Sequence, residues 1–201
     1  MTKNDISEPK QQRSILKKQK IIEAGYKLFC EKGFYNTNTA EIATQAGVST
    51  GIVYRYFPDK RAIFIDSLPL FFSSIYSGAY IEIANLAQPI DYVTVLNKII
   101  DSLVASHDYS KDAHEEMMAM SHSDPQVKEY FSQASRTMNT QLAEVLKHIG
   151  LDIDFPYEKM HIIIEMIESY CHEVVFAKDD TLDYDVLKKI LISTIIGILT
   201  L

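Results

Sequence analysis

Residues 37–64 read TNTAEIATQAGVSTGIVYRYFPDKRAIF, and they determine how the rest of the chain is organised. Apolar residues recur at helical spacing as far as Ala46, and Gly47 then offers a positive φ at little cost. Val53 and Phe57 stand four residues apart, which is about one turn of a second helix. The pattern predicts two short helices joined by a tight turn.

The ends of these helices carry suitable capping residues. Thr39 is expected to cap the first helix, and Ser49 or Thr50 the second, because their hydroxyls can accept from unpaired backbone N–H groups. Pro58 is expected to stop the second helix, and Asp59 to cap a third.

The spacing of Ala43, Gly47 and Val53 is typical of a helix-turn-helix. In this motif the small alanine lets the two helices approach closely, the glycine forms the turn, and the valine packs into the angle between the helices. A plain helical hairpin with polar residues facing water is the alternative. The outer face of the second helix offers hydroxyls, a guanidinium and one bare aliphatic group, a mixture suited to phosphates and base edges. This face consists of Thr50, Gly51, Ile52, Tyr54, Arg55 and Tyr56.

The segment VSTGIVYRYFPDK at residues 48–60 resembles the signature of the TetR family of transcriptional repressors. Residues 20–34, KIIEAGYKLFCEKGF, resemble the first helix of that family. The resemblance covers about residues 17–66. Beyond them it implies the architecture of a helical regulatory domain but not the identity of a ligand.

The resemblance also implies roles for individual residues on double-stranded DNA. Three of them are expected to hold phosphates: Thr39, Tyr54 and Lys60. Five others are expected to contact the DNA bases or the DNA backbone: Ser49, Thr50, Gly51, Arg55 and Tyr56. Ile52 has no polar group, so we expect it to touch a thymine methyl group.

Charge is divided unevenly along the chain, whose formal net charge is −7. Residues 1–61 hold 11 basic and 6 acidic residues, a net +5, whereas residues 62–201 hold 9 basic and 21 acidic residues, a net −12. A basic head and an acidic body are typical of a DNA-binding domain joined to a separate regulatory domain.

Several features favour a cytoplasmic protein without a membrane span. The N-terminus is polar and carries no signal-peptide pattern, and the apolar run at 190–201 is shorter than the ~20 residues that cross a bilayer. Cys30 and Cys171 lie in helical patterns, so we expect buried thiols rather than a disulfide.

Periodicity along the chain predicts an all-α fold of about nine helices. We expect a flexible arm at 1–12, the helix-turn-helix domain at 13–61, and a ligand-binding and dimerisation domain at 62–201. Pro69 should kink or break the fourth helix, which begins near Asp59. The other long helices are expected at 13–32, 90–107, 111–121, 125–149, 157–178 and 182–201.

The last two helices carry more apolar surface than one chain can cover, which favours a four-helix bundle with a second copy. The family resemblance implies the same homodimer, and a purely intramolecular core is the alternative. The expected interface residues are Ile163, Ile167, Val174, Leu187, Ile190, Leu191, Ile195 and Ile198.

A Met-rich and aromatic set from several helices suits an apolar or amphipathic effector, although each residue alone fits an ordinary core. The family resemblance is the main reason to expect an effector site. The candidate pocket residues are Phe71, Phe72, Tyr76, Tyr92, Met117, Met118, Met120, Tyr130, Phe131 and Met138.

The chain lacks a phosphate-binding loop, a Gly-x-Ser-x-Gly elbow and a Cys-x-x-Cys pair, so neither an enzyme nor a cofactor is expected. His161, Glu165, Glu168 and His172 form one helical stripe that could bind a divalent metal, but a solvated polar stripe is the preferred interpretation.

Together these patterns predict a homodimeric repressor that a small molecule releases from a palindromic operator. An activator, a repressor without a ligand, and a metal-responsive regulator remain alternatives.

Overall fold

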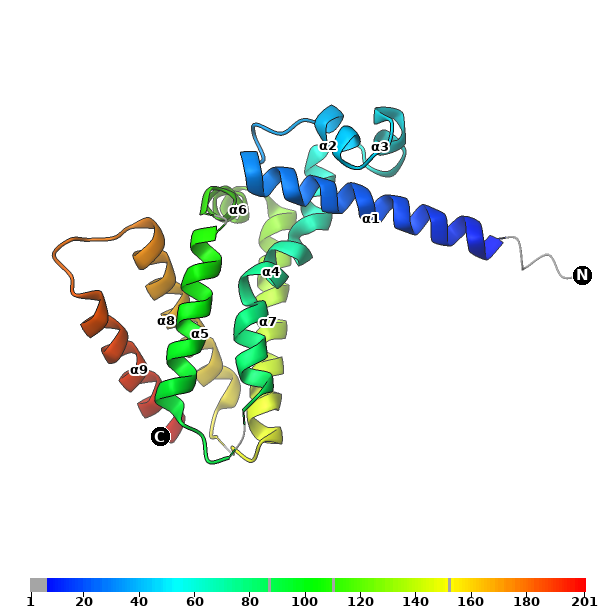
Figure 1. Ribbon diagram of the computed structural model, residues 1–201. Coiled ribbons are helices and arrows are strands. Elements are labelled where there is room, and N and C mark those ends of the chain that lie inside the picture. The colour runs from blue at the N-terminus through cyan, green and yellow to red at the C-terminus, as the bar shows by residue number, and fades with distance from the viewer. Residues whose placement is uncertain (1–6, 87, 110, 152) are drawn as a thin grey trace, which may run out of the picture. The chain divides into compact units, whose positions relative to one another are not determined.

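The computed structural model describes residues 7–86, 88–109, 111–151 and 153–201. These residues form nine α-helices and no β-strand, which confirms the all-α prediction (Figure 1). The helices are α1 (Ser7–Lys32), α2 (Thr39–Gln45), α3 (Thr50–Tyr56), α4 (Lys60–Ala84), α5 (Tyr92–Tyr109), α6 (Lys111–Ser123), α7 (Pro125–His148), α8 (Pro156–Phe176) and α9 (Tyr184–Thr200).

Two local predictions were wrong. Helix α1 begins at Ser7, so part of the segment predicted as an arm is helical, and residues 1–6 lie outside the described residues. Asn38 rather than Thr39 caps α2, because its side chain accepts from the Glu41 backbone while Glu41 accepts from the Asn38 backbone. Helix α4 continues through Pro69 without a break, which leaves a kink as the effect expected of this proline.

The chain divides into two compact units. Unit 1 comprises Met1–Ser73 and Asp112–Val127, and unit 2 comprises Ser74–Lys111 and Lys128–Leu201. Unit 1 therefore contains, in addition to the helix-turn-helix, most of α6 and the start of α7. The predicted single boundary at residue 61 differs from this discontinuous arrangement.

Aromatic rings fill the core of unit 1. Phe29, Phe34 and Phe64 contact one another with ring centroids 5.1–5.7 Å apart, and the Phe64 ring lies 5.7 Å from that of Phe71. Edge-to-face contacts of this kind add to the free energy gained by burying the rings. This core packs α1 against the start of α4.

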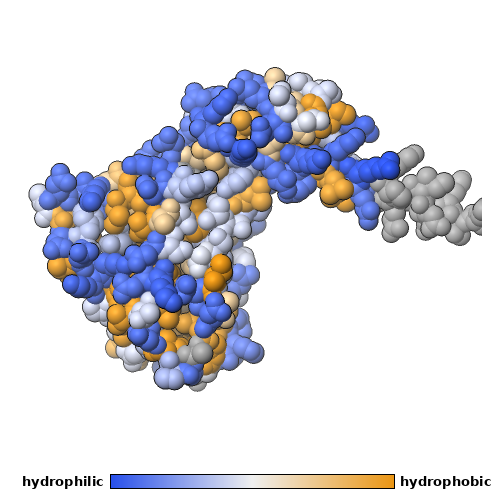
Figure 2. Space-filling view, in the orientation of Figure 1, coloured by the Kyte–Doolittle hydropathy of each residue, from blue (hydrophilic) through white to orange (hydrophobic). Residues whose placement is uncertain are grey.

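Unit 2 is a bundle in which α5 packs against α8 and α9, and α8 packs against α9. Ile100 and Ile195 are fully buried between these helices. In Figure 2, apolar surface interrupts the hydrophilic surface of unit 2 in several places.

Among the described helices, only α4 has the length and apolarity to cross a membrane. Its apolar residues Ile63, Leu68, Phe71 and Ile75 are nevertheless buried in the protein, as expected for a core helix of a globular fold.

Candidate functional sites

The turn between α2 and α3 has the geometry that the sequence predicts. Gly47 has a φ of +67°, and the backbone N–H of Val48 donates to the Ala43 carbonyl at 3.0 Å. Ala43 and Val53 are buried where the two helices meet. The helix-turn-helix is therefore present, and its two short helices are held by a tight turn and a small apolar contact.

The outer face of α3 combines exposed and anchored side chains. Gly51, Tyr54 and Arg55 are exposed, with 56% of the Tyr54 surface open to solvent, whereas Ile52 is half-buried. The Tyr56 hydroxyl is hydrogen-bonded to the Ser14 hydroxyl of α1 at 3.0 Å. A Cβ added at Gly51 would meet no protein atom within 4 Å, so packing within the protein does not require glycine there.

Of the other four predicted DNA contacts, Thr50 is the half-buried first residue of α3, and the remaining three lie at the edges of this face. Ser49 is exposed at the N-cap of α3, where its side chain makes no capping bond, and Thr39 is half-buried in the first turn of α2. The Lys60 ammonium donates to the carbonyls of Phe34, Tyr35 and Thr37 at 2.7, 3.2 and 2.8 Å. An ammonium has three protons, so a phosphate contact of Lys60 would have to share or replace one of these bonds.

A bidentate ion pair within unit 1 joins the first turn of α4 to the turn between α6 and α7. Arg61 donates from Nε to Asp124 Oδ2 at 2.5 Å and from Nη2 to Oδ1 at 2.7 Å. Asp124 also accepts from the backbone N–H groups of Gln126 and Val127. The hydrogen bonds from Arg61 are the main reason that the pKa of Asp124 falls to about 2.

This lowered pKa gives a pH-dependent prediction. Asp124 should stabilise the fold above its ordinary pKa of 3.8, and that contribution should be lost as pH falls through about 2. We expect Asp124→Asn, which keeps the capping oxygen, to lower the urea midpoint at pH 7. The difference between variant and wild type should shrink between about pH 4 and pH 2. A difference that stays constant over this range would contradict the prediction.

Unit 2 contains an apolar cavity of about 130 Å³. Its wall is mostly aliphatic, and Glu168 is the charged residue among those that line it. The cavity is lined by Tyr76, Ala79, Tyr80, Ile83, Leu86, Ile90, Tyr92, Val95, Leu96, Ile99, Leu103, Met138, Leu142, Leu146, Leu151, Met160, Ile163, Ile164, Ile167, Glu168, Ile195 and Leu199.

Three of the ten predicted pocket residues line this cavity: Tyr76, Tyr92 and Met138. The others do not, because five belong to unit 1 and two point elsewhere in unit 2. The five in unit 1 are Phe71, Phe72, Met117, Met118 and Met120, and the two in unit 2 are Tyr130 and Phe131.

Sequence reasoning missed the contribution of α8 and α9 to this cavity. Ile163, Ile167 and Ile195, which are also predicted at the dimer interface, line the cavity, and Leu191 is buried with them. Ile190 is 57% exposed, and Val174, Leu187 and Ile198 are half-buried.

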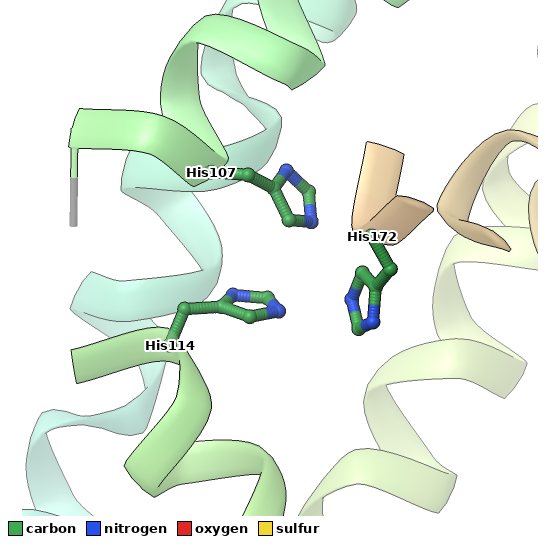
Figure 3. A group of neighbouring side chains, drawn as sticks. All are labelled: His107, His114 and His172. Carbon is green, nitrogen blue, oxygen red and sulfur yellow. The ribbon is translucent and has the colours of Figure 1, made fainter. Parts of the chain in front are cut away.

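A polar cluster adjoins the cavity at Glu168. Tyr76 donates its hydroxyl to the Glu168 carboxylate, and His107 Nε2 lies 3.2 Å from Glu168 Oε2. His107 Nδ1 lies 2.8 Å from the Leu103 carbonyl, and His172 Nε2 lies 3.9 Å from the same Glu168 oxygen. Figure 3 shows the rings of His107 on α5 and His172 on α8 turned toward one another, with centroids 5.5 Å apart.

The two imidazoles of this cluster titrate differently. Burial lowers the pKa of His107, but the hydrogen bond and charge of Glu168, with the Leu103 carbonyl, outweigh burial and raise that pKa overall. Burial dominates at His172 and lowers its pKa. His114, also labelled in Figure 3, is a buried residue of unit 1.

The predicted metal stripe on α8 does not act as one group. His161 and Glu165 are exposed, whereas Glu168 and His172 turn toward α5. Positions i and i+11 lie within about 20° of one another around a helix of 3.6 residues per turn, but a rise of 1.5 Å per residue separates them by about 16.5 Å along its axis, too far for one ion.

Cys30 and Cys171 are free thiols, as predicted. Burial raises the pKa of Cys30 to about 11 and that of Cys171 to about 12. Both thiols therefore stay protonated at neutral pH and are poor nucleophiles.

Comparison with known proteins agrees with this geometry. The sequence model of the family described as "Bacterial regulatory proteins, tetR family" matches residues 21–66. The HTH-type transcriptional regulator HbdR from Aromatoleum sp. (strain CIB) is 36% identical over 75 residues, which are 37% of this chain and 33% of HbdR. The chain thus spans about a third of the length of that curated relative.

Solved structures extend the likeness of fold to the rest of the chain. A TetR-family transcriptional regulator from Mesorhizobium loti matches 94% of this chain and 97% of its own, with a TM-score of 0.70 and 21% identity. A transcriptional regulator from Saccharomonospora viridis, solved in complex with choline, matches 89% and 94%, with a TM-score of 0.62 and 16% identity. Residues 21–66 therefore match the DNA-binding domain of the tetR family of bacterial regulatory proteins, and the chain as a whole shares the helical fold of solved TetR-family regulators.

Proposed function

We propose that this protein is a homodimeric transcriptional repressor that binds a palindromic operator and leaves it when a small molecule occupies the cavity of unit 2. The observation that carries the proposal is the outer face of α3, where Tyr54 and Arg55 project from a helix-turn-helix whose packing does not need them. A DNA partner implies a cytoplasmic location.

Helix α3 would lie in the major groove, with the two copies about 34–36 Å apart on successive turns of DNA. Arg55 is the residue suited to a guanine edge, because its guanidinium can donate two hydrogen bonds in one plane. Ile52 would contact a thymine methyl group, and the hydroxyls of Thr39, Ser49 and Tyr54 would form hydrogen bonds with the phosphates of the DNA backbone. Ile52→Ala should therefore relax base preference in a binding selection.

Replacing Gly51 with alanine should raise the stability of the fold but lower its affinity for the operator. In Gly51→Ala the new methyl group meets open space, so the free energy of unfolding should rise by about 0.5 kcal/mol. The same methyl group would occupy the gap into which DNA fits, so operator affinity should fall. Denaturant unfolding and fluorescence anisotropy measure the two effects. Unchanged affinity in a stabilised variant would place Gly51 outside the DNA contact.

The dimer would form through the exposed faces of α8 and α9. Ile162 on α8 and Val186 and Ile190 on α9 are 50%, 47% and 57% exposed, so each helix presents large aliphatic side chains to solvent. Packing them against a second copy would form a four-helix bundle.

We expect Ile190→Asp to weaken dimerisation at least about tenfold, because a carboxylate would be buried without a partner at the interface. Sedimentation equilibrium measures the dissociation constant directly. The matched control is Ile81→Asp, which changes an equally exposed isoleucine of α4. Equal dimerisation of both variants would rule out this surface.

The effector would be a compact apolar or amphipathic molecule, because the cavity wall is aliphatic and Glu168 is its charged residue. A ligand changes DNA affinity only if it binds one conformation more tightly than another. Release of fluorescent operator during a screen of small hydrocarbons, alcohols and amines, with choline included, tests this step. The cavity variant Ala79→Phe should abolish any response found while operator binding persists.

A further inference from the structure

We propose that His107, Glu168 and His172 form a binding site for a divalent transition-metal ion of the zinc class. All three residues belong to unit 2, two of them on α8 and one on the facing helix α5. The site does not depend on DNA binding, so its test is separate from that of the proposed function.

The spacing of the possible ligand atoms suits one small ion. Zinc lies about 2.0–2.1 Å from nitrogen and oxygen ligands, which places tetrahedral ligand atoms about 3.3 Å from one another. Glu168 Oε2 lies 3.2 Å from His107 Nε2 and 3.9 Å from His172 Nε2. The ligand nitrogens of His107 and His172 lie within 4.8 Å of each other. Side-chain rotations that close the distance between the two histidine nitrogens by up to about 1.5 Å would bring the three atoms to one ion.

Neighbouring groups orient these ligands as in known metal sites. The His107 Nδ1–H donates to the Leu103 carbonyl at 2.8 Å, which directs Nε2 toward Glu168. The Tyr76 hydroxyl donates to the Glu168 carboxylate and restrains it. His107 is fully buried and the side chain of Glu168 is 21% exposed, so much of the water that competes for a metal is excluded.

The donor set selects the class of metal. Two imidazoles and one carboxylate suit zinc and its neighbours, whereas magnesium and calcium prefer oxygen ligands alone. Three protein ligands leave a coordination position for water or for a donor atom of another molecule. Because Glu168 also lines the cavity, a cavity ligand and the metal would affect each other's affinity.

A proton shared by His107 and Glu168 is the simpler alternative. Such an ion pair involves those two residues alone, whereas the same carboxylate oxygen also lies 3.9 Å from His172, one turn further along α8. A neutral imidazole is the form that binds metal. Protons and metal compete for these ligands, so metal affinity should fall as pH falls.

The first test is a zinc titration of the full chain against a chromophoric chelator, after prior chelator treatment and dialysis. We expect about one tight site per chain. Glu168→Gln and His172→Gln should each weaken zinc binding at least about tenfold. The matched control is His161→Gln, which removes an exposed histidine from the same helix and should leave binding unchanged. Equal zinc affinity of all three variants would overturn the proposal.

A second measurement does not depend on whether the variants fold. Zinc K-edge X-ray absorption of the loaded wild-type protein should show two imidazole nitrogens and a carboxylate oxygen at about 2.0–2.1 Å. A shell of water oxygens with one imidazole or none would indicate adventitious surface binding and would also overturn the proposal. Operator binding measured without zinc remains an independent test of the regulatory function.

Discussion

Arg55→Ala is expected to weaken binding to the operator by about ten- to a hundredfold at fixed salt, since a bidentate contact to a base contributes about 1–3 kcal/mol of discrimination. Arg55 is exposed on α3, and among the described residues no hydrogen bond or ion pair ties its side chain to the helix-turn-helix. The variant should therefore unfold at the same temperature as the wild type. Fluorescence anisotropy with labelled operator measures the loss.

The control must remove the same charge without touching the reading helix. Arg136→Ala does so, because Arg136 is an exposed residue of α7 in unit 2. We expect its operator affinity to differ from wild type by less than about twofold at physiological salt. If both variants bind alike, α3 does not read the operator and the assignment of this face is wrong.

Ile195→Ala should have the largest effect on stability, because Ile195 is fully buried and its side chain forms part of the cavity wall. Truncating a buried isoleucine costs about 2–5 kcal/mol, made up of lost transfer free energy and a residual void. Each kcal/mol corresponds to about 2–4 °C in a protein of this size. Calorimetry at one fixed protein concentration, which removes the influence of dimerisation, should show the shift.

Val93→Ala is the matched control for this prediction. Val93 is 53% exposed on α5, so its truncation should change the free energy of unfolding by about 0.5 kcal/mol or less. Comparable losses of unfolding free energy in both variants would mean that Ile195 is not part of the core of unit 2.

The helix-turn-helix could be predicted from the sequence because short-range features determine it. A positive φ at Gly47 and a buried Val53 follow from residue type and spacing alone. The cap of α2 was misplaced by one residue, although the sequence held the decisive signal. Asn38 and Glu41 have the spacing of a reciprocal capping pair, which Thr39 cannot form.

The cavity could not be predicted because periodicity does not say which apolar face meets which partner. Helix α8 carries Ile162, Ile163 and Ile164 in succession, so apolar residues lie on several of its faces. One face lines the cavity and another is exposed. The distinction depends on contacts between helices distant in sequence.

The position of His107, in contrast, left a signal in the sequence. It continues the buried series Leu96, Ile99, Ile100 and Leu103 at helical spacing, which places it on the inner face of α5. Its proximity to Glu168, 61 residues away, depends on the packing of α5 against α8 and could not be read from either helix alone.

Selection of bound DNA from a random pool, with purified full-length protein at defined salt, tests the central claim most directly. The proposed function predicts a palindromic consensus whose half-sites lie one helical turn apart, about 10–10.5 base pairs from centre to centre. Recovery of no consensus, with binding that vanishes as salt rises, would show only attraction between the basic N-terminal region and phosphates. That result would contradict a sequence-specific repressor.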